Sequence, residues 1–241
     1  MKEIVSVRNV AKSYGDTEII KDATFSIDEG IIYTLLGKNG SGKTTLLKMI
    51  AGLSKKSSGE IQFMGQTIEE AFPTLLGQLG FSIEEPKYYE HLTGQENLLL
   101  HLTYMGNRKS EEEVNQVLDQ VGLFSKKDTC LKEYSLGMKQ RLAIARTIIH
   151  NPKLVILDEP FNGLDPKGID DIGHLIRQLA QKERMSFIIS SHLLHQTLEI
   201  SDKVLILNAG TIVVDETLMQ LTMDYGEQLR EKLIYLMEDV K

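Results

Sequence analysis

An eight-residue glycine-rich loop constrains the fold of this 241-residue chain more than any other feature. Residues 37–44 read Gly-Lys-Asn-Gly-Ser-Gly-Lys-Thr and match the pattern G-x-x-x-x-G-K-[ST]. The apolar run at 31–36 predicts a buried strand before the loop, and residues 45–53 predict a helix after it. Glycines let the backbone wrap around an anion, and unpaired amides at the start of the helix point at it. The order of strand, loop and helix therefore predicts a site for the phosphates of a nucleotide.

Two side chains of the loop have the chemistry that such a site needs. We expect Lys43 to reach the β- and γ-phosphates and the hydroxyl of Thr44 to bind Mg²⁺. The alternative is a chance glycine turn, and the flanking strand and helix argue against it. The other residues that we predict to bind the nucleotide are Gly37, Asn39, Gly40, Ser41, Gly42 and Thr45.

The composition narrows the range of partners. With a net charge of −7 and scattered lysines and arginines, the chain lacks the basic face that would hold a nucleic acid. No apolar stretch approaches the ~18 residues that cross a bilayer, so other chains would supply any membrane span. Cys130 is the only cysteine, which excludes a disulfide within the chain and fits a reducing compartment.

The pattern of apolar residues divides the chain into a sheet-forming part and a helical insert. Alternating apolar and polar residues near the N-terminus predict strands at 4–10 and 23–27. Short apolar runs later in the chain predict buried parallel strands, with helices around 169–182 and 193–200 between them. The predicted parallel strands are 154–157, 187–190 and 204–207. Apolar residues at three- and four-residue spacing between 84 and 150 are typical of helices.

We therefore predict an α/β fold with a mainly parallel core sheet flanked by helices, an N-terminal antiparallel β subdomain and an inserted helical subdomain. The predicted core comprises residues 1–83 and 151–214 and includes the β subdomain. The predicted helical subdomain is about 84–150, and a helical tail follows at about 215–241.

Two acidic residues follow the predicted strand 154–157. Asp158 and Glu159 would lie at the carboxyl edge of the sheet, where ligands bind in open α/β folds. We expect Asp158 to hold Mg²⁺ and Glu159 to polarise an attacking water as general base. A strand that ends in a polar turn is the alternative, and the phosphate loop elsewhere in the chain argues against it.

Two further positions are candidates for phosphate contacts. His192 lies two residues after the predicted strand 187–190 and could donate a hydrogen bond to a γ-phosphate. Ser135 and Gly137 precede a predicted helix whose start could bind an anion. Taken alone, each has a plainer alternative: a structural or exposed histidine, and an ordinary helix N-cap.

Together these motifs resemble the nucleotide-binding subunit of an ATP-binding cassette (ABC) transporter, over about residues 5–214. The resemblance implies a P-loop NTPase fold and an ATP hydrolase. It also implies that Tyr14 stacks on adenine, although a turn tyrosine packed on the first sheet stays an alternative. By the resemblance, 37–44 is the Walker A loop, 154–159 the Walker B strand, 134–138 the signature motif, 162–165 the D-loop and His192 the switch histidine.

The chain departs from the usual family pattern at two motifs. The signature usually reads Leu-Ser-Gly-Gly-Gln, whereas Leu136 and Met138 here replace a glycine and the glutamine. At the Q-loop, Glu84 stands where the family has glutamine. A carboxylate can meet Mg²⁺ or its water but cannot donate a hydrogen bond when ionised, so we expect an altered metal contact at Glu84. Both departures resemble the branch of bacitracin-resistance and lantibiotic-immunity exporters.

The resemblance also implies cofactors and partners. ATP and Mg²⁺ would bind at the seam of a head-to-tail dimer with a second ATPase subunit, either identical or different. The helical insert would dock on integral membrane permease subunits at the cytoplasmic face of the cell membrane, with Tyr88 and Tyr89 as candidate contacts. No nucleic acid is expected.

Three other functions stay open at this point. A single cassette could act as an ATP-gated clamp in a soluble assembly rather than in transport. A soluble P-loop GTPase or kinase would leave the signature and histidine motifs unexplained, and no Asn-Lys-x-Asp sequence is present to read guanine. A binding module without turnover conflicts with the intact pair of Asp158 and Glu159.

Overall fold

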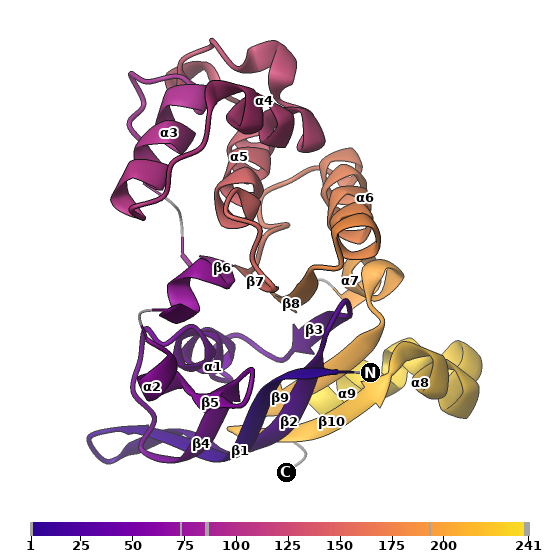
Figure 1. Cartoon of the computed structure of the whole chain (residues 1–241). Helices are drawn as coiled ribbons and strands as arrows, with labels where there is room; N and C mark the ends of the chain where they lie inside the picture. The colour runs from indigo at the N-terminus through magenta and orange to yellow at the C-terminus, as the bar shows by residue number, and fades with distance from the viewer. Residues whose placement is uncertain (1, 73, 85–86, 193, 239–241) are drawn as a thin grey trace.

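The computed structural model describes residues 2–72, 74–84, 87–192 and 194–238, in which a strand-rich lower part carries a helical part above it (Figure 1). The strands are β1 (Glu3–Tyr14), β2 (Thr17–Asp28), β3 (Ile32–Leu36), β4 (Ser58–Phe63), β5 (Gln66–Thr67), β6 (Leu79–Ser82), β7 (Leu154–Asp158), β8 (Ser186–Ser191), β9 (Lys203–Asn208) and β10 (Thr211–Thr217). The α-helices are α1 (Lys43–Ile50), α2 (Ile68–Ala71), α3 (Gly94–Tyr104), α4 (Glu111–Gln120), α5 (Leu136–Ile148), α6 (Pro166–Glu183), α7 (Leu194–Ile200), α8 (Leu218–Tyr225) and α9 (Leu229–Met237).

The strands form one mixed sheet in the order β5-β4-β1-β2-β10-β9-β3-β8-β7-β6. The run from β9 to β6 is parallel throughout, whereas β1 pairs antiparallel with β2 and β4. Strand β10 joins the two parts because it is antiparallel to β9 and forms one parallel bridge to β2, between Thr211 and Asp22. The predicted α/β fold with a mainly parallel core and an N-terminal antiparallel part is confirmed.

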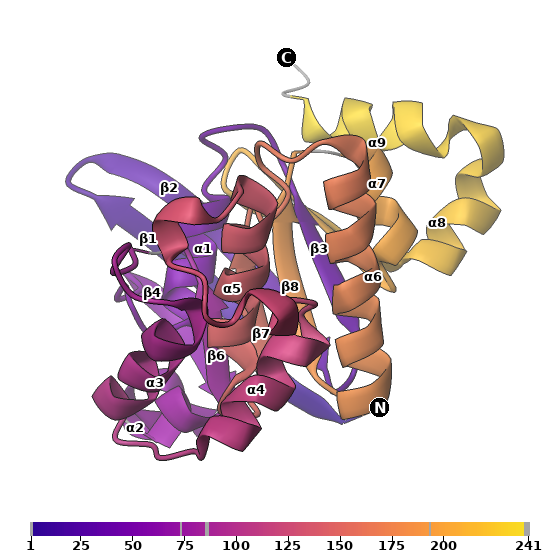
Figure 2. The same cartoon turned by 90° about the horizontal axis from the view of Figure 1, so that it is seen from above.

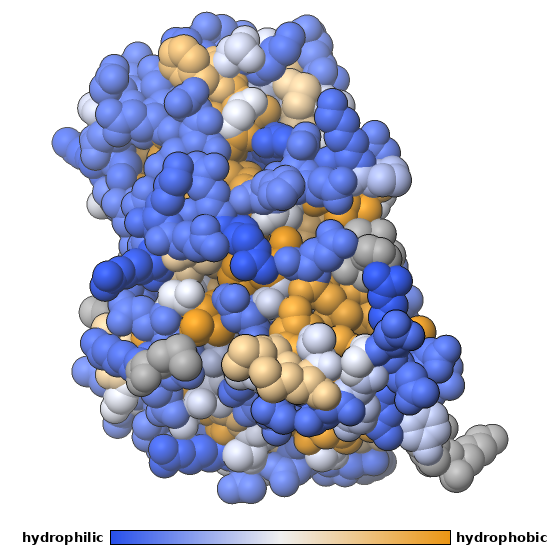
Figure 3. Space-filling model, turned by 90° about the vertical axis from the view of Figure 1, so that its right-hand side faces the viewer, coloured by the Kyte–Doolittle hydropathy of each residue, from blue (hydrophilic) through white to orange (hydrophobic). Residues whose placement is uncertain are grey.

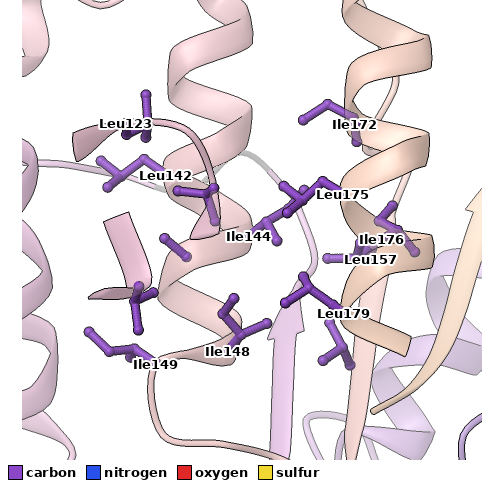
Figure 4. Close-up of a cluster of buried hydrophobic side chains, with 14 of the residues drawn as sticks. Leu123, Leu142, Ile144, Ile148, Ile149, Leu157, Ile172, Leu175, Ile176 and Leu179 are labelled. Atoms are coloured by element: carbon purple, nitrogen blue, oxygen red, sulfur yellow. The ribbon is translucent and has the colours of Figure 1, made fainter. Parts of the chain in front are cut away.

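The parallel strands are buried on both faces, which explains their continuous apolar sequences. On one face, α1 lies between the parallel strands and the antiparallel part, in a cluster with Val7, Ile61 and Leu154. On the other face, α5 and α6 pack together over the sheet, and Ile144, Leu157 and their neighbours fill the space between them (Figure 4). The strands predicted at 154–157, 187–190 and 204–207 are all present.

Helices α3 and α4 lie beside α5, and α6 stands on its other side (Figure 2). Both α3 and α4 begin with a capping box, formed by Thr93 with Glu96 and by Ser110 with Glu113. The first box places the start of α3 at Gly94, within the region that the sequence predicts to be helical. The bounds of the helical subdomain at about 84 and 150 stay a prediction.

A third hydrophobic cluster lies where the C-terminal helices cover the sheet. Leu36, the last residue of β3, is fully buried there with Leu221 of α8 and with Leu229 and Leu233 of α9. Because β10 extends to Thr217, the helical tail begins at Leu218 and not at about 215 as the sequence predicts. Residues 239–241 of the predicted tail lie outside the described residues.

The side of the molecule shown in Figure 3 is mainly hydrophilic. On the side shown in Figure 3, hydrophobic side chains gather at mid-height between two largely hydrophilic regions. Within the described part of the chain, every helix is too short or too polar to cross a bilayer.

His101 on α3 makes stability depend on pH. Burial lowers the pKa of His101 from 6.5 to about 4, and the charge of Arg146 and the nearby His150 act in the same direction. Between pH 6.5 and 4 the unfolded chain therefore binds more protons than the folded one, so stability falls as the pH falls through this window. We expect a loss of about 1 to 3 kcal/mol from His101 between pH 7 and 4.5, measured by urea unfolding.

His101→Gln should remove much of this pH dependence. His174→Gln, at an exposed position on α6, is the matched control and should keep the wild-type slope. Equal slopes in wild type and His101→Gln would show that His101 is not the responsible group.

Candidate active site

The glycine-rich loop leaves β3 and enters α1 at Gly42. Gly42 has a φ of 103°, and a Cβ there would lie 2.6 Å from Ile20 Cδ1, so only glycine fits without strain. Helix α1 starts at Lys43, two residues earlier than predicted, and no side chain caps its first turn. The free amides of that turn are therefore open to an anion.

Lys43 is nearly buried at the base of the loop, with 6% of its surface exposed. Its Nζ donates to the backbone oxygens of Gly37 at 2.8 Å and Lys38 at 3.1 Å, and lies 3.9 Å from a carboxylate oxygen of Glu159. Burial lowers the pKa of Lys43, and the charges of Glu159 and Asp158 partly oppose this shift. A desolvated ammonium group that is held by two carbonyl oxygens is well placed to bind a phosphate group.

Asp158, the last residue of β7, connects the loop to the sheet. Thr44 Oγ1 donates to Asp158 Oδ2 at 2.7 Å, and Ser190 Oγ donates to the other carboxylate oxygen. The same Ser190 oxygen accepts a hydrogen bond from the backbone N of Glu159 at 2.9 Å. Ser190 is the last residue of the strand predicted at 187–190, and no role is predicted for it from the sequence. The pairing of β7 with β8 places it opposite Asp158, and this register could have been derived by aligning the two apolar strands.

Glu159 and His192 lie together at this edge of the sheet. Nδ1 of His192 is 2.8 Å from Oε2 of Glu159. The backbone of Glu159 has a φ of 51°, a left-handed conformation that is uncommon for a residue other than glycine. Such strain gathers at functional sites, where the surrounding structure holds a side chain in place.

The oxygen atoms of Thr44 and Asp158 suit a small divalent cation. Mg²⁺ prefers hydroxyl and carboxylate oxygens and usually takes further ligands from phosphates and water. Within the described chain no group of three or more His, Cys, Asp or Glu side chains could hold a metal ion alone. The residues therefore fit a cation that a bound nucleotide completes.

The other residues predicted to bind the nucleotide differ in exposure. Tyr14 ends β1, is 54% exposed, and has the Nζ of Lys12 4.5 Å above its ring. Asn39 and Gly40 are exposed, Thr45 is half-buried, and Ser41 Oγ is buried without a hydrogen-bond partner among the described residues.

Glu84 is bound by a lysine instead of lying against Asp158. Its carboxylate is 2.5 Å from Lys48 Nζ on α1, and this ion pair lowers the pKa of Glu84. No role for Lys48 is predicted from the sequence.

The two signature residues do not reach the loop within one chain. Ser135 is the N-cap of α5, and its Oγ accepts a hydrogen bond from the backbone N of Met138 at 3.3 Å. No hydrogen bond or ion pair in the described structure joins Ser135 or Gly137 to residues 37–44. Within a single chain, Ser135 therefore has the plainer role of a helix cap.

Known proteins that are similar in sequence to this chain are ATP-binding proteins of ABC transporters. The family model described as "ABC transporter" matches residues 20–162. An ABC transporter ATP-binding protein of Bacillus subtilis, YcbN, is 43% identical over 88% of this chain and 69% of its own length. The bacitracin transport ATP-binding protein BcrA of Enterococcus faecalis is 38% identical over 92% and 71%. The lantibiotic transport ATP-binding protein SrtF of Streptococcus pyogenes is 38% identical over 88% and 90%.

Solved structures agree in fold. An ATP-binding subunit of an ABC transporter superposes with a TM-score of 0.84 at 29% identity, covering 98% of this chain and 100% of that one. An ATP-binding cassette in its ADP conformation superposes with a TM-score of 0.86 at 24% identity, covering 98% of each chain, and this likeness concerns the fold alone.

The close packing at Gly42 predicts a cost for any side chain there. Gly42→Ala should lower the free energy of unfolding by about 2 to 4 kcal/mol, because the methyl group adds a clash with Ile20 to the backbone strain. Gly30→Ala is the matched control, since Gly30 has a φ of 76° and nothing lies within 4 Å of its Cβ position. It should cost about 1 kcal/mol. Equal losses in urea unfolding would contradict the proposed clash.

Proposed function

This chain belongs to the ABC transporter family as an ATP-binding and ATP-hydrolysing subunit, and we propose that its transporter exports a peptide antibiotic of the bacitracin or lantibiotic kind. The relatives named for bacitracin and lantibiotic transport support this class of substrate. The changes at Leu136 and Glu84, which pointed to the same branch, support it as well. A soluble ATP-gated clamp is not favoured, because these relatives are transport proteins.

In the proposed site, the first turn of α1 and the glycine-rich loop bind the phosphates of ATP. Lys43 exchanges its carbonyl partners for the β- and γ-phosphates. The loop residues Gly37, Asn39, Gly40, Ser41, Gly42 and Thr45 contribute amides or hydroxyls, and Tyr14 stacks on adenine. Thr44 and Asp158 hold Mg²⁺, which supplies charge neutralisation at the phosphates when bound. Glu84 would reach that metal only after release from Lys48.

The cluster around Glu159 is the observation that carries the proposal of hydrolysis. Glu159 acts as general base and takes a proton from the attacking water. Ser190 fixes the backbone of Glu159, and His192 contacts its carboxylate. Nδ1 of His192 faces this carboxylate, and Nε2 is the ring nitrogen that would donate to the γ-phosphate.

We propose that Ser135 and Gly137 act on the nucleotide of a second ATPase subunit in a head-to-tail dimer. This arrangement would explain why an exposed serine at a helix start lies apart from the loop of its own chain. ATP would then join the two subunits, and its hydrolysis would release them.

The helical part would dock on a permease subunit at the cytoplasmic face of the membrane. Tyr89 supports this placement, because it is 48% exposed and its Oη lies 3.4 Å from that of Tyr104, which is 71% exposed. Tyr88 instead packs against the core of the helical part, and burial raises its pKa. Tyr89 is therefore the better candidate of the two predicted contacts.

Glu159→Gln should bind ATP but lower kcat by about 100-fold or more, because the amide cannot accept the proton. Light scattering of this variant should show a monomer without nucleotide and a dimer with Mg-ATP. Wild-type hydrolysis by Glu159→Gln would exclude the general-base role. A variant that binds ATP and stays monomeric would contradict a homodimer formed by the isolated chain. It would leave two arrangements, a dimer that closes only on the membrane partner and a dimer with a second, different cassette.

Cells that lose this protein should become several-fold more susceptible to bacitracin or to a lantibiotic. The wild-type chain should restore resistance, whereas Glu159→Gln should not. Susceptibility to an unrelated antibiotic that is not a peptide is the control. Unchanged susceptibility to both peptide classes would contradict the proposed substrate.

A further inference from the structure

Leu136 occupies an unusual place for an apolar side chain. It is the first residue of α5, directly after the N-cap Ser135, and is 47% exposed. Its Cδ2 lies over Gly163, since a Cβ built on Gly163 would stand only 2.7 Å from that atom. The glycine therefore makes room for the leucine, and any larger residue at 163 would displace it.

The loop that carries Gly163 starts at the proposed general base. The backbone N of Asn162 donates to the carbonyl oxygen of Glu159 at 3.2 Å, and Asp165 caps α6 by accepting from the N of Gly168 at 2.9 Å. Gly163 itself has a φ of 75° between these two anchors. Gly163 is thus one residue from the hydrogen bond that ties this loop to the backbone of Glu159.

A second leucine–glycine contact, between Leu164 and Gly137, joins the same two segments in the opposite direction. A Cβ on Gly137 would lie 3.7 Å from Leu164 Cδ2, at ordinary van der Waals distance, and Leu164 packs against the core below. Leu136 thus lies over a glycine of the 162–165 loop, and Leu164 lies beside a glycine of α5. The starts of α5 and α6 interlock through these pairs.

Elsewhere around Leu136 the structure is open. It borders two cavities of about 460 Å³ each. One is also lined by Glu84, Asp158 and Glu159, and the other by Tyr88 and Leu131. Because these cavities flank the start of α5, the contact of Leu136 with Gly163 is an important link between the helical part and the 162–165 loop.

We propose that Leu136 is a positioning residue for ATP hydrolysis, which acts through Gly163 of its own chain to set the position of Glu159 relative to α5. The inference rests on the proposed role of Glu159. It differs from the proposed action of Ser135 and Gly137, because it operates within one chain. It also gives a physical role to a residue that departs from the family signature.

A double-mutant cycle tests the pair. Gly163→Ala should lower kcat by about tenfold while KM for ATP changes less than twofold, because its methyl group pushes Leu136 and the loop apart but leaves the phosphate loop intact. In the double variant Leu136→Gly/Gly163→Ala the clash is absent, so kcat should rise again to that of Leu136→Gly. Gly30→Ala, which has a similar φ of 76° in open space, is the control for backbone strain and should keep wild-type kcat.

If the loss of kcat in the double variant equals the product of the losses in the two single variants, the proposal is overturned. Such independence would show that Leu136 does not act through Gly163. An increase in KM without a loss of kcat would overturn it as well, because the leucine would then serve nucleotide binding.

A measurement on the nucleotide-free protein separates this inference from the proposed function. Spin labels at Gln120→Cys on α4 and Lys182→Cys on α6, in a Cys130→Ser background, report the distance between the helical part and the core. Leu136→Gly should broaden or shift this distribution, and Leu136→Met should preserve it. Identical distributions in wild type and Leu136→Gly would overturn the link even if ATP is hydrolysed. If Leu136→Gly changes the distance distribution but the wild-type protein has no ATPase activity, the contact between Leu136 and Gly163 is supported and the proposed ATP hydrolysis is refuted.

Discussion

The carboxylate of Asp158 is the interaction on which the rest of the site depends. One oxygen accepts from Thr44 at the start of α1, and the other accepts from Ser190 at the end of β8. Three segments far apart in the sequence are thereby held at one edge of the sheet. Ser190 extends this restraint to the backbone of Glu159, so the proposed general base and the oxygens proposed to hold Mg²⁺ share one network. Cooperative networks of this kind are rigid when every member is satisfied.

Much of this network follows from sequence because its parts lie on strongly patterned elements. The strands β3, β7 and β8 are buried on both faces, so their sequences are continuous apolar runs, and polar residues at their ends stand out. The phosphate loop is constrained by backbone geometry that only glycine tolerates. Local sequence therefore placed Lys43, Thr44, Asp158, Glu159 and His192 at the same edge of the sheet.

The remaining features depend on contacts between distant segments. Strand β10 lies at the seam between the antiparallel and parallel parts, and its half-exposed residues show neither clear alternation nor a buried run. The pairing of Lys48 with Glu84 joins residues 36 positions apart, and the contact of Leu136 with Gly163 joins the start of α5 to the 162–165 loop. Hydrophobic periodicity does not reveal such pairs, because it reports the pattern within one segment and not which distant segment lies against it.

The burial of Leu36 beneath α8 and α9 has a consequence for control of the enzyme. The residue directly before the phosphate loop shares a hydrophobic cluster with the C-terminal helices, and Asn208 on the adjacent strand donates to the carbonyl oxygens of Leu236 and Glu238. A molecule that binds the C-terminal helices more tightly when the loop holds nucleotide must raise the affinity of the loop for nucleotide by the same factor, because such coupling is reciprocal. Binding at the outer face of α8 and α9 would therefore alter the affinity of the loop for ATP wherever it distinguishes the two states of the loop.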